Sequence, residues 1–250
     1  MGVNKNMQKP TFLKSARLRK SWGFKTAISP VDSIVMGFQQ DELVAITSNT
    51  DVYLPQAFLI NSACRHASGE DPRAIMYFST IHNIENFYIK LAEIATGIHA
   101  NTVFDDRMAF LRLSSSLKGK RHSNKLIFRG IPFLSPEKMV DEIEESNIAE
   151  IAAIYIDSVE NIYIPEQSIL PEEKESYRLR QLKQISMAVN APLFAGMSSL
   201  PADPVISKSI TLDISHDNPE VIMASIRGAG SSVNTEIPYN PEIGIFAVKQ

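Results

Sequence analysis

The sequence has a single cysteine, Cys64, so no disulfide can form within the chain. It has no run of about 20 apolar residues, the length that a membrane-spanning helix requires. The basic N-terminal segment is not followed by the apolar core of a signal peptide. These absences fit a reducing compartment, and we expect a cytoplasmic protein that makes no contact with a membrane.

Acidic residues are missing from two stretches of the chain. Residues Met1 to Val31 include no Asp or Glu. The segment from Arg107 to Arg129 has none either, and its basic residues include Arg107, Arg112, Lys118, Lys120, Arg121 and Lys125. Since the whole chain has a net charge of −3, no global attraction to nucleic acid is expected. The basic stretches are either solvated helix faces and tails, or patches that contact nucleic acid or an acidic partner.

Short apolar runs rich in β-branched and aromatic residues predict buried strands. We expect strands at Leu43–Thr47, Ala74–Phe78, Lys125–Phe128, Ile151–Ile156, Pro192–Ala195, Val221–Ala224 and Ile243–Val248. Helical spacing of apolar residues predicts helices at Pro55–Ala67, Ile84–Ile98 and Glu173–Val189. Ser135 followed by Pro136 indicates the start of a further helix.

Strands that alternate with helices favour a parallel sheet covered on both faces. The last two predicted strands, joined by the polar stretch Gly228–Asn234, indicate an antiparallel hairpin at a sheet edge. The expected fold class is therefore α/β, with a mainly parallel central sheet flanked by helices and an antiparallel hairpin at one edge. We expect one domain over residues 20–250, preceded by a flexible basic segment at 1–19.

Several stretches follow one another in an order typical of one family. They are GFKTAISPVDSIVMGFQQDELVAITS (from Gly23), IMYFSTIHNIENFYIKLAEIATGI, LIFRGIPFLSPEKMVDEI, IAAIYIDSV, RLRQLKQISMAVNAPLFAGMSSL and PEVIMASIRGAG. Their order and spacing, from Gly23 to Phe246, resemble the C-terminal motor domain of DnaB-type replicative helicases. The resemblance implies a RecA-like P-loop NTPase fold. The family's N-terminal primase-interacting domain has no counterpart in the sequence.

The stretch that corresponds to the family's Walker A phosphate loop is altered. Such a loop needs glycines to let backbone N–H groups surround phosphate, a lysine for the β and γ phosphates, and a hydroxyl for magnesium. Ser48–Gln56 has neither glycine nor lysine, and the lysine position falls at Leu54 or Pro55. Proline also has no N–H to offer. We expect a degenerate Walker A motif that holds no ATP.

Other positions that the resemblance implies for catalysis are also changed. The water-activating glutamate falls at Ile81, the sensor glutamine at Ser198 and the first finger residue, a lysine, at Ser225. Asp157 and Arg227 are retained. Asp157 is either a Walker B magnesium ligand or a strand-end carboxylate that accepts nearby N–H groups. Arg227 is either a finger that reaches a neighbouring subunit's phosphate or a surface arginine.

No other set of side chains predicts a reaction. The five histidines are scattered without metal-ligand spacing, so we expect no metal site. Cys64 lies in an apolar helical pattern and is interpreted as a core residue. We therefore expect no catalytic residues and no cofactor.

Three functions stay open from the sequence. The first is a catalytically degenerate helicase-like domain that acts in DNA replication or maintenance by binding DNA, a replicative helicase or other replication protein, or copies of itself. The second is an active ATP-dependent helicase that uses ATP and magnesium with a lysine from elsewhere, such as Lys90. The third is a structural or regulatory module without nucleic-acid contact. Fold alone does not choose among them.

Overall fold

The computed structural model describes residues 23–99, 102, 125–165, 169–170, 173–228 and 230–246. Its helices are α1 (Ser29–Val35), α2 (Leu54–Ser68), α3 (Ile84–Thr96), α6 (Pro136–Glu145) and α7 (Lys174–Val189). Its strands are β1 (Leu43–Thr47), β2 (Ala74–Ser79), β3 (Leu126–Gly130), β4 (Ile151–Ile156), β5 (Leu193–Gly196), β6 (Lys208–Ile214), β7 (Val221–Gly228), β8 (Ser231–Asn240) and β9 (Ile245–Phe246).

The strands form one sheet in the order β3-β2-β4-β5-β1-β6-β7-β8-β9. All pairs from β3 to β6 are parallel, and β7, β8 and β9 are added antiparallel. Every residue of β1, β2 and β5 is buried, as expected for interior strands that helices cover on both faces. The predicted fold class is confirmed.

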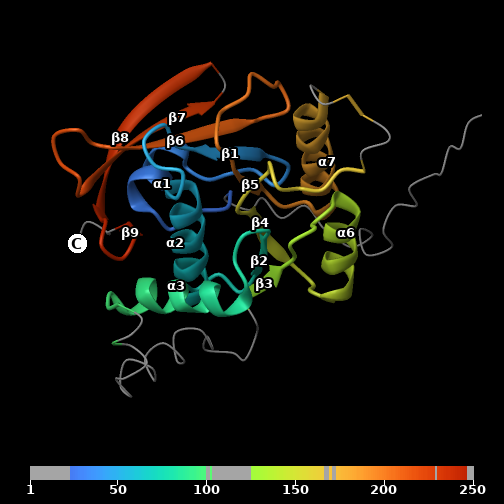
Figure 1. The fold of residues 1–250 in the computed structure, drawn as a ribbon, viewed down its shortest axis with the longest axis horizontal. Coiled ribbons are helices and arrows are strands. Elements are labelled where there is room, and N and C mark those ends of the chain that lie inside the picture. The colour runs from blue at the N-terminus through green and yellow to red at the C-terminus, as the bar shows by residue number, and fades with distance from the viewer. Residues whose placement is uncertain are drawn as a thin grey trace, which may run out of the picture.

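Alternate residues of each central strand contribute to two separate cores (Figure 1). Helices α1, α2 and α3 cover one face, where Tyr77, Tyr155 and Phe194 are packed. Helices α6 and α7 cover the other face over Met76, Ile154 and the remaining central side chains. This period-two division is the pattern that a buried strand imposes on its side chains.

The segment before β1 is held by close backbone contact. Phe24 and Phe38 form an antiparallel bridge, with N···O distances of 2.8 and 2.7 Å in the two directions. A Cβ added to Gly23 would lie 2.6 Å from the Phe38 carbonyl oxygen, so only glycine fits there. The bridge brings the Phe38 ring to 4.8 Å from that of Phe194, and thus joins α1 to the sheet.

Two strands were not expected and one was expected too long. Ser231–Asn240 forms β8, although Gly228–Asn234 was predicted to be a connection. Lys208–Ile214 forms β6, which no apolar run indicated. Only Ile245–Phe246 of the predicted last strand is in the sheet, and residues 247–250 lie outside the described part. The error at β8 has a physical reason, because this outer strand is mostly exposed and lacks the apolar signal of a buried one.

Candidate functional site

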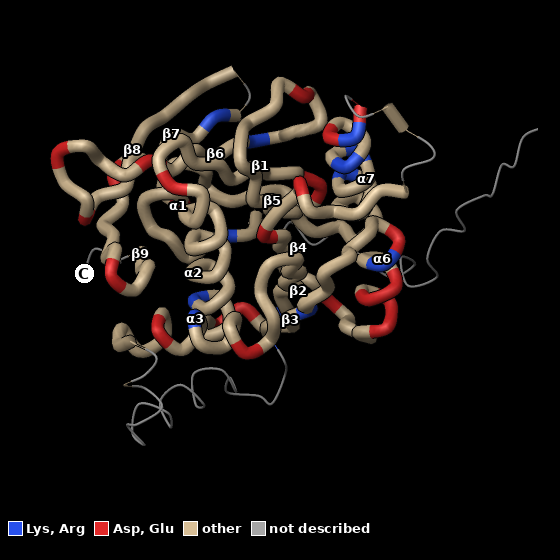
Figure 2. Tube along the Cα trace, viewed as in Figure 1, with Lys and Arg blue, Asp and Glu red and all other residues tan. Residues whose placement is uncertain are grey.

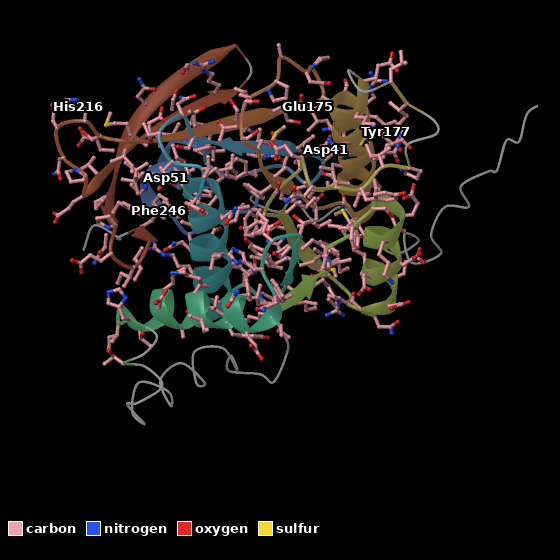
Figure 3. All side chains as sticks on the ribbon, in the orientation of Figure 1. Asp41, Asp51, Glu175, Tyr177, His216 and Phe246 are labelled. Atoms are coloured by element: carbon pink, nitrogen blue, oxygen red, sulfur yellow. The ribbon has the colours of Figure 1, made fainter. Side chains whose placement is uncertain are left out.

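The carboxyl ends of the parallel strands meet at one edge of the sheet, where open α/β sheets bind ligands. Asp51, just after β1, and Asp41, just before it, mark the carboxyl and amino edges (Figure 3). The loops after β1, β2, β4 and β5 carry most of the positions that the sequence singled out. We describe this carboxyl edge as the candidate site.

The backbone N–H groups of the loop after β1 are bonded to the chain's own side chains. The Asn49 N–H donates to Asp213 Oδ1 at 2.8 Å, and the Asn49 side-chain amide donates to Asp213 Oδ2 at 3.0 Å. The N–H groups of Thr50 and Asp51 both donate to Ser48 Oγ, at 3.2 and 3.0 Å. Carboxylate and hydroxyl oxygens thus occupy the donors that a phosphate loop directs at phosphate.

The loop continues directly into α2. The Tyr53 N–H donates to Asp51 Oδ1 at 2.8 Å. Leu54, one of the two candidate lysine positions, is fully buried, and Pro55, the other, is also buried. Val52 and Tyr53 are 66% and 68% exposed. At the carboxyl edge the loop therefore presents carboxylate and apolar groups, with no cation of its own.

Asp157 is buried, with 2% of its surface exposed, directly after β4. Its Oδ2 accepts a hydrogen bond from Ser79 Oγ, and its Oδ1 accepts from the N–H and the hydroxyl of Thr80, at 3.0 and 3.2 Å. Burial raises the pKa of the Asp157 carboxyl, while the bonds from Ser79 and Thr80 act in the opposite direction. Both carboxylate oxygens are thus engaged in holding the loop after β2, which is the strand-end role considered from the sequence.

The neighbouring altered positions are also tied into local structure. Ile81 is 46% exposed, and its N–H donates to Ser79 Oγ at 3.2 Å. Ser198 donates from its N–H and its hydroxyl to Glu160 Oε1, at 2.6 and 2.8 Å. Glu160 is therefore part of the candidate site, although the sequence did not indicate it.

Ser225 and Arg227 lie on β7, away from the carboxyl edge. Arg227 pairs with Ser209 near the start of β6, and so lies toward the amino ends of the parallel strands. It is exposed and lines an open groove of about 630 Å³ together with Lys208 and Ser232. Asp157 and Arg227 are therefore not brought together within one chain.

The predicted nucleic-acid residues are largely outside the described part of the chain. This applies to Arg107, Arg112, Lys118, Lys120 and Arg121. Lys125 is described, and its Nζ donates to the Gly69 carbonyl oxygen at 2.6 Å. Lys90, the alternative phosphate ligand, is paired with Glu93 on α3 at 2.8 Å.

Within the described residues, no cluster of His, Cys, Asp and Glu has the arrangement of a metal site. Cys64 is buried, and burial raises the pKa of its thiol to about 11, which disfavours the nucleophilic thiolate. No described helix is long and apolar enough to cross a bilayer. The interpretation of Cys64 as a core residue is confirmed.

The fold is similar to solved structures of replicative helicases. One is a DnaB-like replicative helicase described with its interactions with primase, with a TM-score of 0.74, 13% identity and coverage of 90% of this chain. Another is a solved ATPase domain, with a TM-score of 0.75, 13% identity and coverage of 91% of this chain and 92% of the other. The present chain spans 63% of the first structure. The sequence matches no family model and no curated protein.

These similarities confirm the predicted RecA-like, DnaB-type fold. At 13% identity they show the fold alone. The chemistry of this chain must be argued from its own residues.

Proposed function

We propose that this domain is a helicase-like module that neither binds nor hydrolyses ATP and acts by binding partners of DNA replication or maintenance. The observation that carries the proposal is the loop after β1. Its N–H groups at Asn49, Thr50, Asp51 and Tyr53 all donate to side chains of the same chain. A triphosphate would have to break these bonds and bring its negative charge beside two carboxylates.

The electrostatics of the loop support the same proposal. Asp51 and Asp213 both direct carboxylate oxygens at loop N–H groups. A working phosphate loop places a lysine at this point, which neutralises the phosphates. Like charges in contact repel, so the carboxylates exclude phosphate as well as compete with it for donors.

The exposed apolar side chains of the carboxyl edge support a role in binding protein. Phe133 is 81% exposed in the loop after β3, and Tyr163 is 49% exposed beyond β4. These loops are adjacent, since the Tyr163 N–H donates to the Leu134 carbonyl oxygen at 2.7 Å. Ile81 lies in the next loop, because the Ile131 N–H donates to the Ser79 carbonyl oxygen at 2.8 Å. Clustered exposed apolar residues of this kind mark interaction surfaces.

The replication context rests on fold similarity to replicative helicase ATPase domains, one of which is described with primase. By analogy, we propose a replication protein as the partner. DNA binding stays a prediction that rests on the basic sequence between Arg107 and Arg129. Phosphate contacts by that segment would weaken steeply as salt concentration rises.

Isothermal titration calorimetry with ATP and magnesium tests the proposal. We expect no saturable heat, because the loop donors are occupied and no lysine offsets the charge of the triphosphate. A working phosphate-loop ATPase measured in the same buffer is the positive control. Binding in the micromolar range would contradict the proposal and restore the active-enzyme interpretation, with ATP and magnesium as cofactors.

A further inference from the structure

β8 presents an open edge of the sheet (Figure 1). Its pairing with β7 runs from Ser231 to Pro238, whereas β9 covers its other side only at Tyr239 and Asn240. The interval from Ser231 to Ile237 therefore has a neighbour on one side only among the described residues. Unpaired backbone groups along a strand are a template for another strand.

The direction of the backbone groups along β8 follows from one printed hydrogen bond. The Tyr239 N–H donates to the Glu220 carbonyl oxygen at 2.7 Å, on the β7 side. Because antiparallel strands alternate, odd-numbered residues face β7, and Ser232, Asn234 and Glu236 direct N–H and C=O outward. Pro238 is the next residue in the outward series and has no N–H, so the outward donors end there.

This edge lacks the devices that usually prevent pairing. The strand contains no lysine or arginine, as Figure 2 shows for the β7–β8 hairpin beyond Arg227. The register between β7 and β8 is continuous from Val221 to Gly228, without a bulge. Residues Ser231 to Asn234 are all exposed. Natural sheets blunt open edges with charge, bulges or proline, and here only Pro238 at the far end does so.

The outward residues are complementary to themselves. In an antiparallel pair centred on Asn234, Ser232 of one copy opposes Glu236 of the other, and Val233 opposes Thr235. Each outward residue then meets another outward residue, and no glutamate faces a glutamate. The interval between the β7–β8 turn and β9 also has the length of the segment that would fill it.

Two exposed charges without partners lie on the same face of this edge. Among the described residues, neither Arg227 nor Glu236 takes part in an ion pair. Arg227 pairs with Ser232 across β7 and β8. In the register above, Glu236 of a second copy lies beyond that serine, about 10 Å from Arg227 between Cα atoms, or two strand spacings. The small serine leaves room for the two long side chains to meet over it.

We propose that two copies of this chain associate through β8, antiparallel about a twofold axis at Asn234, with Arg227 of each copy paired to Glu236 of the other. The occupant of the open edge is thus a second copy, selected by this charge complementarity and by the matching length. The interface is isologous, as in most closed homodimers. It does not depend on the phosphate loop, so the calorimetric test of the proposed function and the tests below fail or succeed separately.

Sedimentation analysis of the full chain measures the association. We expect a concentration-dependent dimer of twice the 27.8 kDa chain mass. Arg227→Glu should weaken the dimer by about tenfold or more, because it places two acids together across each end of the interface. Adding Glu236→Arg to that variant should restore it. A monomer at all concentrations up to about 100 μM, or a charge-swapped variant no better than Arg227→Glu, would overturn the proposal.

Cysteine cross-linking tests the register. Asn234→Cys places two thiols in one cross-strand pair, with Cα atoms about 5.5 Å apart, within the range of a disulfide. Ser231→Cys is the matched control, since its two copies would lie about 20 Å apart along the strands. The native Cys64 is buried in both variants. We expect a cross-linked dimer under mild oxidation only with Asn234→Cys, and equal cross-linking of both variants, or of neither, would contradict this register.

Discussion

Asp157→Ala is expected to lower the free energy of unfolding by about 2–3 kcal/mol, although its sequence position suggests a metal ligand. The carboxylate is almost fully buried and accepts hydrogen bonds from Ser79 and Thr80. Alanine would leave these buried donors without acceptors and would release the loop that carries Ile81. Urea unfolding at neutral pH measures the effect.

Asp157→Asn is the matched control, because it keeps the shape and one carbonyl oxygen for Thr80. We expect it to cost less than about 1 kcal/mol, since it also removes the unfavourable burial of a charge. If the two variants are equally stable, the carboxylate does not hold the loop and the strand-end role is wrong.

The pH dependence of the Asp157 contribution has a definite sign. Burial raises the pKa of its carboxyl above the ordinary value of 3.8. The folded state then binds the proton more tightly than the unfolded state, so the stabilisation is present at low pH and is lost as pH rises through the folded pKa. The stability of the wild type relative to Asp157→Asn should therefore increase as pH falls from neutral toward 3.8.

Gly196→Ala is expected to destabilise the fold by more than about 3 kcal/mol, or to prevent folding. A Cβ at this position would lie 2.3 Å from the carbonyl oxygen of Asp157, and this atom belongs to the backbone. Gly196 pairs with Ile46 of β1, so neither strand can move away without opening the centre of the sheet. Thermal unfolding and the yield of folded protein measure the effect.

Gly97→Ala provides a control in which the same substitution meets open space. Gly97 ends α3 with a φ of +72°, and nothing lies within 4 Å of the added Cβ. The cost there is only that of a left-handed backbone, about 1 kcal/mol. A Gly196→Ala protein as stable as Gly97→Ala would show that β4 and β5 are less closely packed at their ends than described.

The central sheet could be predicted because burial leaves a strong signal in the sequence. Ile151–Ile156 is apolar at every position and forms β4 with the predicted bounds. Ser135 caps α6 as expected, since its Oγ accepts the Lys138 N–H at 3.2 Å. The outer strands could not be predicted in the same way, because β8 is polar and mostly exposed.

The contents of the candidate site were only partly predictable. The absence of glycine and lysine from Ser48–Gln56 is plain in the sequence. The role of Asp213 is not, since it lies 164 residues from Asn49 in a strand that the sequence did not indicate. Glu160 was missed for a similar reason, because its contact with Ser198 depends on how β4 and β5 end.

The most direct test of the occupied loop is to follow the backbone amide resonances of Asn49, Thr50, Asp51 and Tyr53 while ATP and magnesium are added in excess. The hydrogen bonds to Ser48, Asp51 and Asp213 predict that these four resonances stay in place. Saturable shifts at these amides would show that phosphate displaces the side chains, and would contradict the proposed loss of nucleotide binding.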